Sequence, residues 1–380
     1  MDFALTEDQA MLRDMARDFA TDVVLPKARQ HDAEEKLDPS VLDAMGELGL
    51  WGLTIPEEYG GAGLDNLALA LVLIEVNKAC ASTGVTLSVH NSLVSAPILK
   101  HGTDEQRQRW LPKLASGEHL GAYCLTEAGS GSDSAALATR AELDGDDYVL
   151  NGTKMWVTNG GFAGLFIVYA RSDFEVKKTH GVTAFLVPKD APGLSVGKHE
   201  LKTGIRGSST TEILLENVRV PKTSVLGEVG RGFHLAMDTL DGGRIGIAAQ
   251  AVGIGEACLE ASILYAKNRH QFGRPIGEFQ AIQWKLADMS ARLRAARLMT
   301  LEAAWTRDRG EPCSQLAAQA KLSASITANF CADECLQIHG GAGYTDDFHV
   351  ERLFRDARIT EIYEGATDIQ RLVVARKLLA

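Results

Sequence analysis

The sequence predicts a multidomain α+β protein with an all-α domain first, an antiparallel β-barrel domain in the middle and a four-helix bundle at the end. A chain of 380 residues is too long for one ordinary hydrophobic core. Apolar residues follow a helical period at both ends, whereas short β-branched and aromatic runs occupy the middle. We therefore expect domains at 1–120, 121–230 and 231–380.

The first third contains two helix-start signals. Thr6 with Gln9 and Thr103 with Gln106 have capping-box spacing, in which the two side chains pair with free backbone N–H groups. Prolines divide this region into five or six helices, because proline cannot donate to the helical hydrogen-bond ladder. They are Pro26, Pro39, Pro56, Pro97 and Pro112.

The middle third has the pattern of β-strands. Runs at 166–169, 183–187 and 211–215 are rich in β-branched and aromatic residues. Asp144-Gly145 and Asn151-Gly152 are dipeptides that tolerate the positive φ of hairpin turns. This spacing predicts an antiparallel sheet or barrel, of which we favour the barrel.

The last third returns to long helical patterns. Expected helices cover 236–268, 279–309, 313–339 and 366–379, a number and length typical of an antiparallel bundle. Thr367 and Gln370 repeat the capping-box spacing, which places Glu364 just outside the start of the final helix.

Composition excludes several classes of function. A net charge of −11 disfavours nucleic acid and anionic membranes as partners. No uninterrupted apolar run approaches the roughly 18 residues of a membrane span, so we expect no membrane insertion. The acidic start at 1–7 does not resemble a signal peptide, and six cysteines without a CxxC pair predict reduced thiols and no metal site. These features favour a prokaryotic cytoplasm.

Four segments hold residues suited to ligand binding, although each alone has a structural explanation. The glycine- and hydroxyl-rich loop in 123–133 could approach a pyrophosphate or simply join two strands. Trp156 could stack on an aromatic cofactor or fill the core. The cationic cluster 269–275 could bind phosphate or form a charged turn, and the glycines of 337–344 could approach a ligand or cap a helix.

The fifth segment, 362–370, contains Glu364. Apolar neighbours would raise the pKa of this carboxyl group, whereas the nearby helix N-terminus would lower it. The environment suits a catalytic base and equally a surface glutamate.

In this order on an α–β–α chain, the five segments resemble the acyl-CoA dehydrogenase family over essentially all 380 residues. The resemblance implies an FAD enzyme that oxidises a short-chain acyl-CoA to the trans-2-enoyl-CoA and passes electrons to an electron-transferring flavoprotein. Short branched-chain members are also similar, so isobutyryl- or 2-methylbutyryl-CoA is the alternative substrate. Less favoured alternatives are a flavin monooxygenase or oxidase on this fold and a non-catalytic acyl-CoA-binding protein.

The resemblance also assigns roles to residues. Glu364 would be the base, because the family's other base position holds Gly243, which cannot accept a proton. Residues expected to bind FAD are Tyr123, Leu125, Thr126, Gly131, Ser132, Trp156, Val157, Thr158, Arg269, Phe272, Gln280, Gln337, Gly340, Gly341, Thr367 and Asp368. Residues expected to bind the substrate are Ser132, Asp241, Arg244, Tyr363 and Gly365.

Two further expectations come from the family. Its members are typically tetramers in which a neighbouring subunit completes each FAD site, a role that falls here to Arg269, Phe272, Gln280 and the 337–341 stretch. We therefore expect a homotetramer. Glutaryl-CoA dehydrogenases have an arginine where this chain has Gly84, which disfavours a dicarboxylate substrate.

Overall fold

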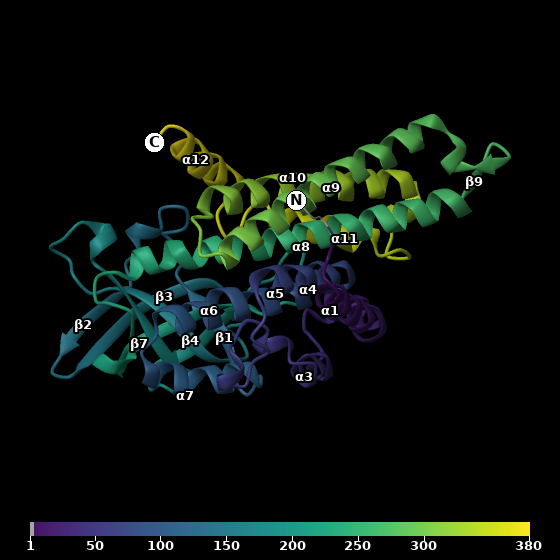
Figure 1. Ribbon diagram of the computed structural model, residues 1–380. Helices are drawn as coiled ribbons and strands as arrows, with labels where there is room; N and C mark the ends of the chain where they lie inside the picture. The colour runs from purple at the N-terminus through teal and green to yellow at the C-terminus, as the bar shows by residue number, and fades with distance from the viewer. Residues whose placement is uncertain (1–3) are drawn as a thin grey trace.

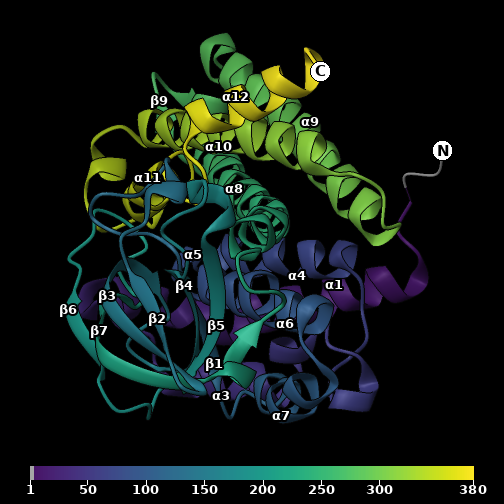
Figure 2. The same cartoon turned by 90° about the vertical axis from the view of Figure 1, so that its left-hand side faces the viewer.

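The computed structural model describes residues 4–380, so the first three residues of the acidic segment 1–7 lie outside the described part. Helices form both ends of the chain and a sheet lies between them in sequence (Figure 1). Figure 2 shows the sheet beside the N-terminal helices, with the long C-terminal helices packed over both. The predicted order of α, β and α elements is confirmed.

The N-terminal helices begin as local sequence signals require. Both predicted capping boxes are present, at Thr6 with Gln9 and at Thr103 with Gln106. Pro112 does not end a helix as predicted, because it lies in the last turn of one whose Trp110 and Leu111 are buried. The helices are α1 Glu7–Phe19, α2 Ala28–Glu34, α3 Pro39–Glu47, α4 Asn66–Ala79, α5 Ala81–Ser88, α6 Ala96–His101 and α7 Asp104–Ala115.

The middle of the chain forms one eight-stranded sheet in the order β6-β7-β3-β2-β4-β5-β8, with β1 paired to β4. The predicted antiparallel barrel is wrong. Within residues 4–380 the end strands β6 and β8 do not pair, and β1 and β2 each run parallel to β4. The strands are β1 Leu120–Cys124, β2 Arg140–Asp144, β3 Asp147–Thr158, β4 Ala163–Arg171, β5 Val182–Pro188, β6 Leu194–His199, β7 Thr210–Pro221 and β8 Val225–Leu226.

The two predicted hairpin turns have different outcomes. Gly145, with a φ of 63°, lies in the tight turn that joins β2 and β3, as predicted. Asn151-Gly152 instead lies inside β3, where the register with β7 shifts. A side chain at Gly152 would stand 2.6 Å from Thr139 Oγ1, so glycine permits a bulge and close packing there rather than a chain reversal.

The C-terminal helices are α8 Gly232–Asn268, α9 Gln280–Asp308, α10 Ser314–His339, α11 Val350–Ile359 and α12 Thr367–Leu378. The four expected helices are present, and α11 was not predicted. The capping box proposed for the final helix is wrong. Thr367 is the first helical residue and donates to Glu361 O, whereas Gln370 donates to Gly365 O.

Helix α8 forms the centre of the molecule, between α4 and the other long helices (Figure 1). Within residues 4–380 it is the one helix long and apolar enough to cross a membrane, with a window of mean hydropathy 1.4. However, 61% of that window is buried inside the protein, as expected of a core helix. Val72 on α4, Ala251 on α8 and Ala324 on α10 belong to one shared core.

Candidate active site

Glu364 lies in the loop between α11 and α12, against helix α8. Its φ of 48° and that of Gly365, 93°, make a left-handed turn that directs the glutamate inward. The Glu364 Oε2 atom is buried and has no hydrogen-bond partner among residues 4–380. A Cβ atom at Gly243 would overlap this oxygen and lie 2.8 Å from Leu93 Cδ2. Gly243 therefore leaves the space that the carboxylate occupies.

The electrostatic surroundings of Glu364 place its ionisation near neutrality. Burial raises the pKa of Glu364 to about 7, although the positive charges of Lys321 and Arg244 act in the opposite direction. Arg244 is paired with Asp241 at 2.6 Å, one turn away on α8. Asp241 also accepts a hydrogen bond from the Ser314 hydroxyl. A group with this pKa can hold or accept a proton at neutral pH.

A buried hydrogen-bonded chain lies beside Glu364. The Tyr363 hydroxyl donates to Gln250 Oε1, and Gln250 Nε2 donates to the Ala81 carbonyl at 3.1 Å. Sequence reasoning did not single out Gln250. The clue in the sequence is that Gln250 lies at helical spacing from Gly243 within the apolar stretch 245–254, where a polar side chain needs a buried partner.

The glycine-rich loop and the tryptophan segment are joined, as their proposed shared role requires. Met155 N donates to Thr126 O at 2.9 Å. The fully buried Lys154 donates to Leu125 O at 3.2 Å and pairs with Glu127 at 2.7 Å. Neither member of this ion pair was predicted to have a role. An inward-facing lysine in the alternating pattern of β3 was the available signal.

The surface formed by these two segments fits a flavin and its pyrophosphate. Trp156 is 55% exposed with a φ of 55°, so its ring projects from the sheet instead of filling the core. Thr126 and Thr158 are half-buried, and Ser132 is exposed. No atom lies within 4 Å of a Cβ placed at Gly131, which leaves the backbone open to a ligand. Leu125 and Val157 are buried, and the Tyr123 hydroxyl is buried without a hydrogen-bond partner in the described part of the chain.

The remaining predicted FAD residues lie elsewhere. Arg269, Phe272 and Gln280 are exposed at the far end of α8, about 42 Å along the helix from Asp241. The 337–341 stretch is nearby, since His339 stacks on Tyr265 with ring centroids 4.2 Å apart. In Figure 1 this end, marked by β9 (His270–Gln271), is opposite the sheet. One chain does not bring this group to Glu364.

Thr367 and Asp368 lie at the start of α12. Asp368 is exposed and pairs with Arg371 at 2.7 Å, and the Thr367 hydroxyl is engaged by Glu361 O. Both side chains thus already have partners within the chain, and neither is left free to bind a ligand.

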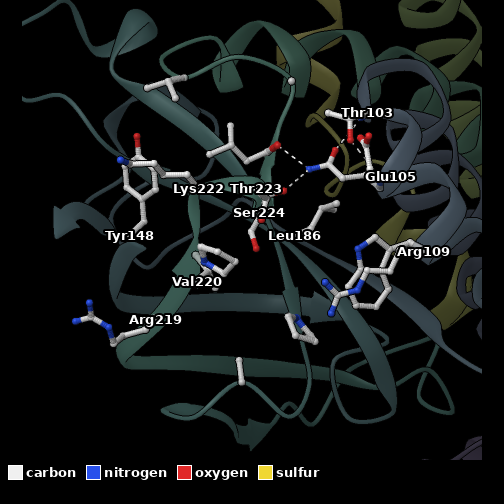
Figure 3. A pocket seen from close by; sticks show the side chains of 18 of the residues that line it. Thr103, Glu105, Arg109, Tyr148, Leu186, Arg219, Val220, Lys222, Thr223 and Ser224 are labelled. Atoms are coloured by element: carbon white, nitrogen blue, oxygen red, sulfur yellow. Dashed lines mark hydrogen bonds between the residues drawn. The ribbon is translucent and has the colours of Figure 1, made fainter. Parts of the chain in front are cut away.

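A recess of about 860 Å³ lies between α7 and the sheet (Figure 3). Gln106 Nε2 spans part of it by donating to the carbonyls of Thr223 and Val225, each at 2.8 Å. Arg109, Lys222 and Glu105 line it, so its charge is mixed. None of the predicted site residues lines this recess. It is distinct from the site around Glu364.

Comparison with protein families covers nearly the whole chain. Residues 6–118 match the acyl-CoA dehydrogenase N-terminal domain, residues 122–218 the middle domain and residues 230–379 the C-terminal domain.

Curated relatives cover the chain at high identity. The mitochondrial short-chain specific acyl-CoA dehydrogenase of Bos taurus is 50% identical over 375 residues, covering 99% of this chain and 91% of the relative. The short-chain specific acyl-CoA dehydrogenase of Clostridium acetobutylicum is 46% identical over 378 residues and covers 100% of both chains. Relatives of this length show that the likeness extends across all three regions.

Solved structures agree in fold over the whole chain. Butyryl-CoA dehydrogenase of Megasphaera elsdenii has a TM-score of 0.98 at 42% identity and covers 100% of both chains. A chain from work on the electron transferring flavoprotein of Acidaminococcus fermentans has the same TM-score at 46% identity, again covering 100% of both. An acyl-CoA dehydrogenase of Bacillus anthracis, solved with FAD, has a TM-score of 0.93 at 36% identity and covers 99% of this chain and 67% of that one. The chain belongs to the acyl-CoA dehydrogenase family, whose enzymes are FAD-dependent oxidoreductases.

Proposed function

We propose that this enzyme oxidises a short-chain acyl-CoA, such as butyryl-CoA, to its trans-2-enoyl-CoA with Glu364 as the base. The observation that carries the proposal is the buried Glu364 Oε2, which has no partner within residues 4–380 and lies in the space left by Gly243. An unpartnered buried carboxylate oxygen is costly unless a ligand group meets it. The acidic α-hydrogen of a thioester is such a group.

Removal of the α-proton requires stabilisation of the charge that develops on the thioester oxygen. The backbone N–H of Glu364 makes no hydrogen bond within residues 4–380, because the left-handed turn takes it out of the helical ladder. We propose that this N–H donates to the thioester oxygen while the Glu364 side chain accepts the α-proton. Glu364 would then serve both needs: its carboxylate accepts the proton, and its backbone N–H stabilises the negative charge on the thioester oxygen.

FAD, when bound, would supply the acceptor for the β-hydride, which is chemistry that no side chain can supply. We propose that Trp156 and Thr158 hold the flavin while the backbone around Gly131 and Ser132 holds the pyrophosphate. Lys154 and Glu127 keep these two segments in register through their buried ion pair. Asp241 and Arg244 would orient the CoA portion at the entrance side of Glu364.

The hydrogen-bonded chain through Gln250 favours a short acyl group. Gln250 lies seven residues after Gly243, or about 10 Å further along α8, and on the same helical face. An acyl chain that enters past Asp241 and Glu364 meets the link between Tyr363 and Gln250 within that distance. A long chain would have to break this link and leave buried polar groups unpaired. The named short-chain relatives support the same substrate class.

An electron-transferring flavoprotein is the proposed electron acceptor, supported by the related chain from work on such a flavoprotein. We also propose a homotetramer, because the exposed Arg269, Phe272 and Gln280 lie too far from Glu364 to serve the FAD site of their own chain. The relative in Clostridium acetobutylicum supports a prokaryotic enzyme, for which we propose the cytoplasm.

The substrate is tested by anaerobic loss of the visible flavin absorbance after addition of one acyl-CoA at a time. The panel contains butyryl-, isobutyryl-, 2-methylbutyryl-, isovaleryl-, octanoyl- and glutaryl-CoA. We expect butyryl-CoA to reduce the flavin fastest, with octanoyl- and glutaryl-CoA slow. Fast reduction by a branched thioester alone would move the proposal to that substrate. An FAD-loaded enzyme that no thioester reduces would refute the dehydrogenase reaction.

The role of Glu364 is tested with Glu364→Gln, which keeps the shape and removes the base. We expect FAD content and product binding to stay near wild type while flavin reduction slows about 10³-fold. Glu361→Gln is a matched control, because Glu361 lies in the same loop but its carboxylate pairs with Arg358. Near-normal reduction by Glu364→Gln would show that another group takes the proton.

A further inference from the structure

Lys321 is a buried lysine to which no part of the proposed reaction assigns a role. It lies on α10, and its side chain is fully buried. Its Nζ donates to the Gly365 carbonyl at 2.7 Å. No carboxylate of residues 4–380 lies within 4.0 Å of this nitrogen. The ammonium group is thus buried without a contact ion pair.

A buried ammonium group without a nearby opposite charge is destabilised by the loss of its hydration. Burial lowers the pKa of Lys321 to about 8, and the charge of Glu364 is the largest influence that acts in the opposite direction. Arg244 and Glu361 exert smaller effects of opposite sign. Lys321 therefore keeps its charge chiefly through Glu364.

The charged groups around Glu364 are not equivalent. Arg244 of α8 faces Glu364 but is already paired with Asp241 at 2.6 Å. Tyr123 of β1 faces it as a neutral phenol, and Tyr363 donates its hydroxyl to Gln250. Lys321 of α10 is the cation near Glu364 that has no carboxylate of residues 4–380 within 4.0 Å, although the charge of Glu361 also acts on it from further away. Its charge is thus free to act on Glu364.

Lys321 also holds the backbone of the glutamate turn. The Gly365 carbonyl accepts from Lys321 Nζ and from Gln370 Nε2, at 2.7 and 2.8 Å. Two donors on one carbonyl fix the orientation of the peptide that follows Gly365, at the end of the glutamate turn. Because Glu364 has a φ of 48°, the turn needs such support to keep its strained geometry.

We propose that Lys321 is a positioning residue for Glu364. The ammonium group of Lys321 fixes the Glu364–Gly365 turn, and its positive charge stabilises the ionised Glu364 carboxylate. This inference rests on the proposed role of Glu364 as the base. Lys321 touches neither the substrate nor the proton in transit. It acts through the glutamate, by setting the pH range in which the base is ionised.

The test is the pH dependence of flavin reduction by butyryl-CoA in three FAD-loaded variants. Lys321→Met removes the charge and the hydrogen bond, and Lys321→Arg keeps the charge. Gln370→Met is the matched control, because it removes the other donor to Gly365 O without any change of charge.

Removal of the positive charge should raise the pKa of Glu364. In Lys321→Met we expect the acid limb of the rate profile to move at least about one pH unit upward, which slows reduction about tenfold at pH below the limb. The rate should approach that of wild type well above the limb. Lys321→Arg should return the midpoint toward wild type, and Gln370→Met should leave the midpoint in place.

An unshifted midpoint in Lys321→Met, or an equal shift in Gln370→Met, would overturn the inference. If Lys321→Met does not fold, Lys321→Gln supplies the same test, since it keeps a donor for Gly365 O without the charge. Failure of the proposed function is distinguishable. In that case wild-type enzyme is not reduced at any pH, whereas failure of this inference alone leaves wild-type reduction intact.

Discussion

Gly243→Ala is the substitution that most directly tests the placement of the base. The change adds one methyl group to α8 at the point where Glu364 Oε2 lies. This methyl group would overlap the carboxylate oxygen and approach Leu93 Cδ2 to 2.8 Å, whereas ordinary contacts begin at 3.4 Å. Leu93 can adjust by a small rotation. The left-handed turn holds the backbone of Glu364, so the overlap can be relieved only if the Glu364 side chain moves.

The expected loss is mainly in rate, with a smaller loss of stability. Displacing a catalytic group by about 1 Å reduces the rate about 10²-fold. Alanine is about 1 kcal/mol more favourable than glycine inside a helix, which offsets part of the roughly 1–3 kcal/mol cost of overpacking. The free energy of unfolding should therefore fall by no more than about 2 kcal/mol.

The assay is anaerobic flavin reduction in Gly243→Ala beside Gly242→Ala. The control adds the same methyl group one residue earlier, where the nearest atoms, at 3.2 and 3.3 Å, belong to the flexible end of Arg307. We expect Gly242→Ala to stay near the wild-type rate. A wild-type rate in Gly243→Ala, with FAD bound, would mean that the Glu364 carboxylate does not react from the position described.

Three further predictions concern other parts of the chain. Lys154→Met leaves Glu127 buried without its cation, so the free energy of unfolding should fall by about 3–5 kcal/mol in denaturant titrations. The double variant Lys154→Met with Glu127→Gln should recover much of this loss. Trp156→Ala removes an exposed ring, so stability should hold while the Kd for FAD rises about tenfold; an unchanged Kd would exclude stacking. Burial raises the pKa of Asp356 to about 6. Between about pH 4 and 6 the folded protein therefore holds a proton on Asp356 that the unfolded chain has lost, so the contribution of Asp356 to the free energy of unfolding falls as pH rises to 6. Asp356→Asn should flatten the plot of the free energy of unfolding against pH in this range. An unaltered plot would contradict this.

Local signals in the sequence predicted local structure well. The capping boxes at Thr6 and Thr103 depend only on residues three positions apart, and both are present. Asn151-Gly152 has the composition of a turn, but Thr139 and Asn217 hold it inside the sheet through contacts that are distant in sequence. The prediction of a closed barrel was wrong for a similar reason. Closure depends on whether β6 meets β8, which no local pattern reveals.

The candidate site divides in the same way. Glu364 was found through the resemblance of its segment to a family, and its role and those of its neighbours stay predictions. Lys154, Lys321 and Gln250 were missed, because polar residues are usually exposed and one sequence does not show which of them are buried. Their importance follows from what lies opposite them: Glu127, Gly365 and Tyr363.

The burial of α8 has a consequence for the synthesis of the protein. Helix α4 leaves the ribosome before α8, but α10, which covers the other side, ends only at His339, 71 residues after Asn268. At about 5–20 residues per second, that interval lasts roughly 4–14 s. During this time α8, which is long and apolar enough to cross a membrane, lacks its packing against α10. A chaperone that shields extended apolar segments would find its main binding site there, and an arrest of translation between 268 and 339 would leave an aggregation-prone fragment.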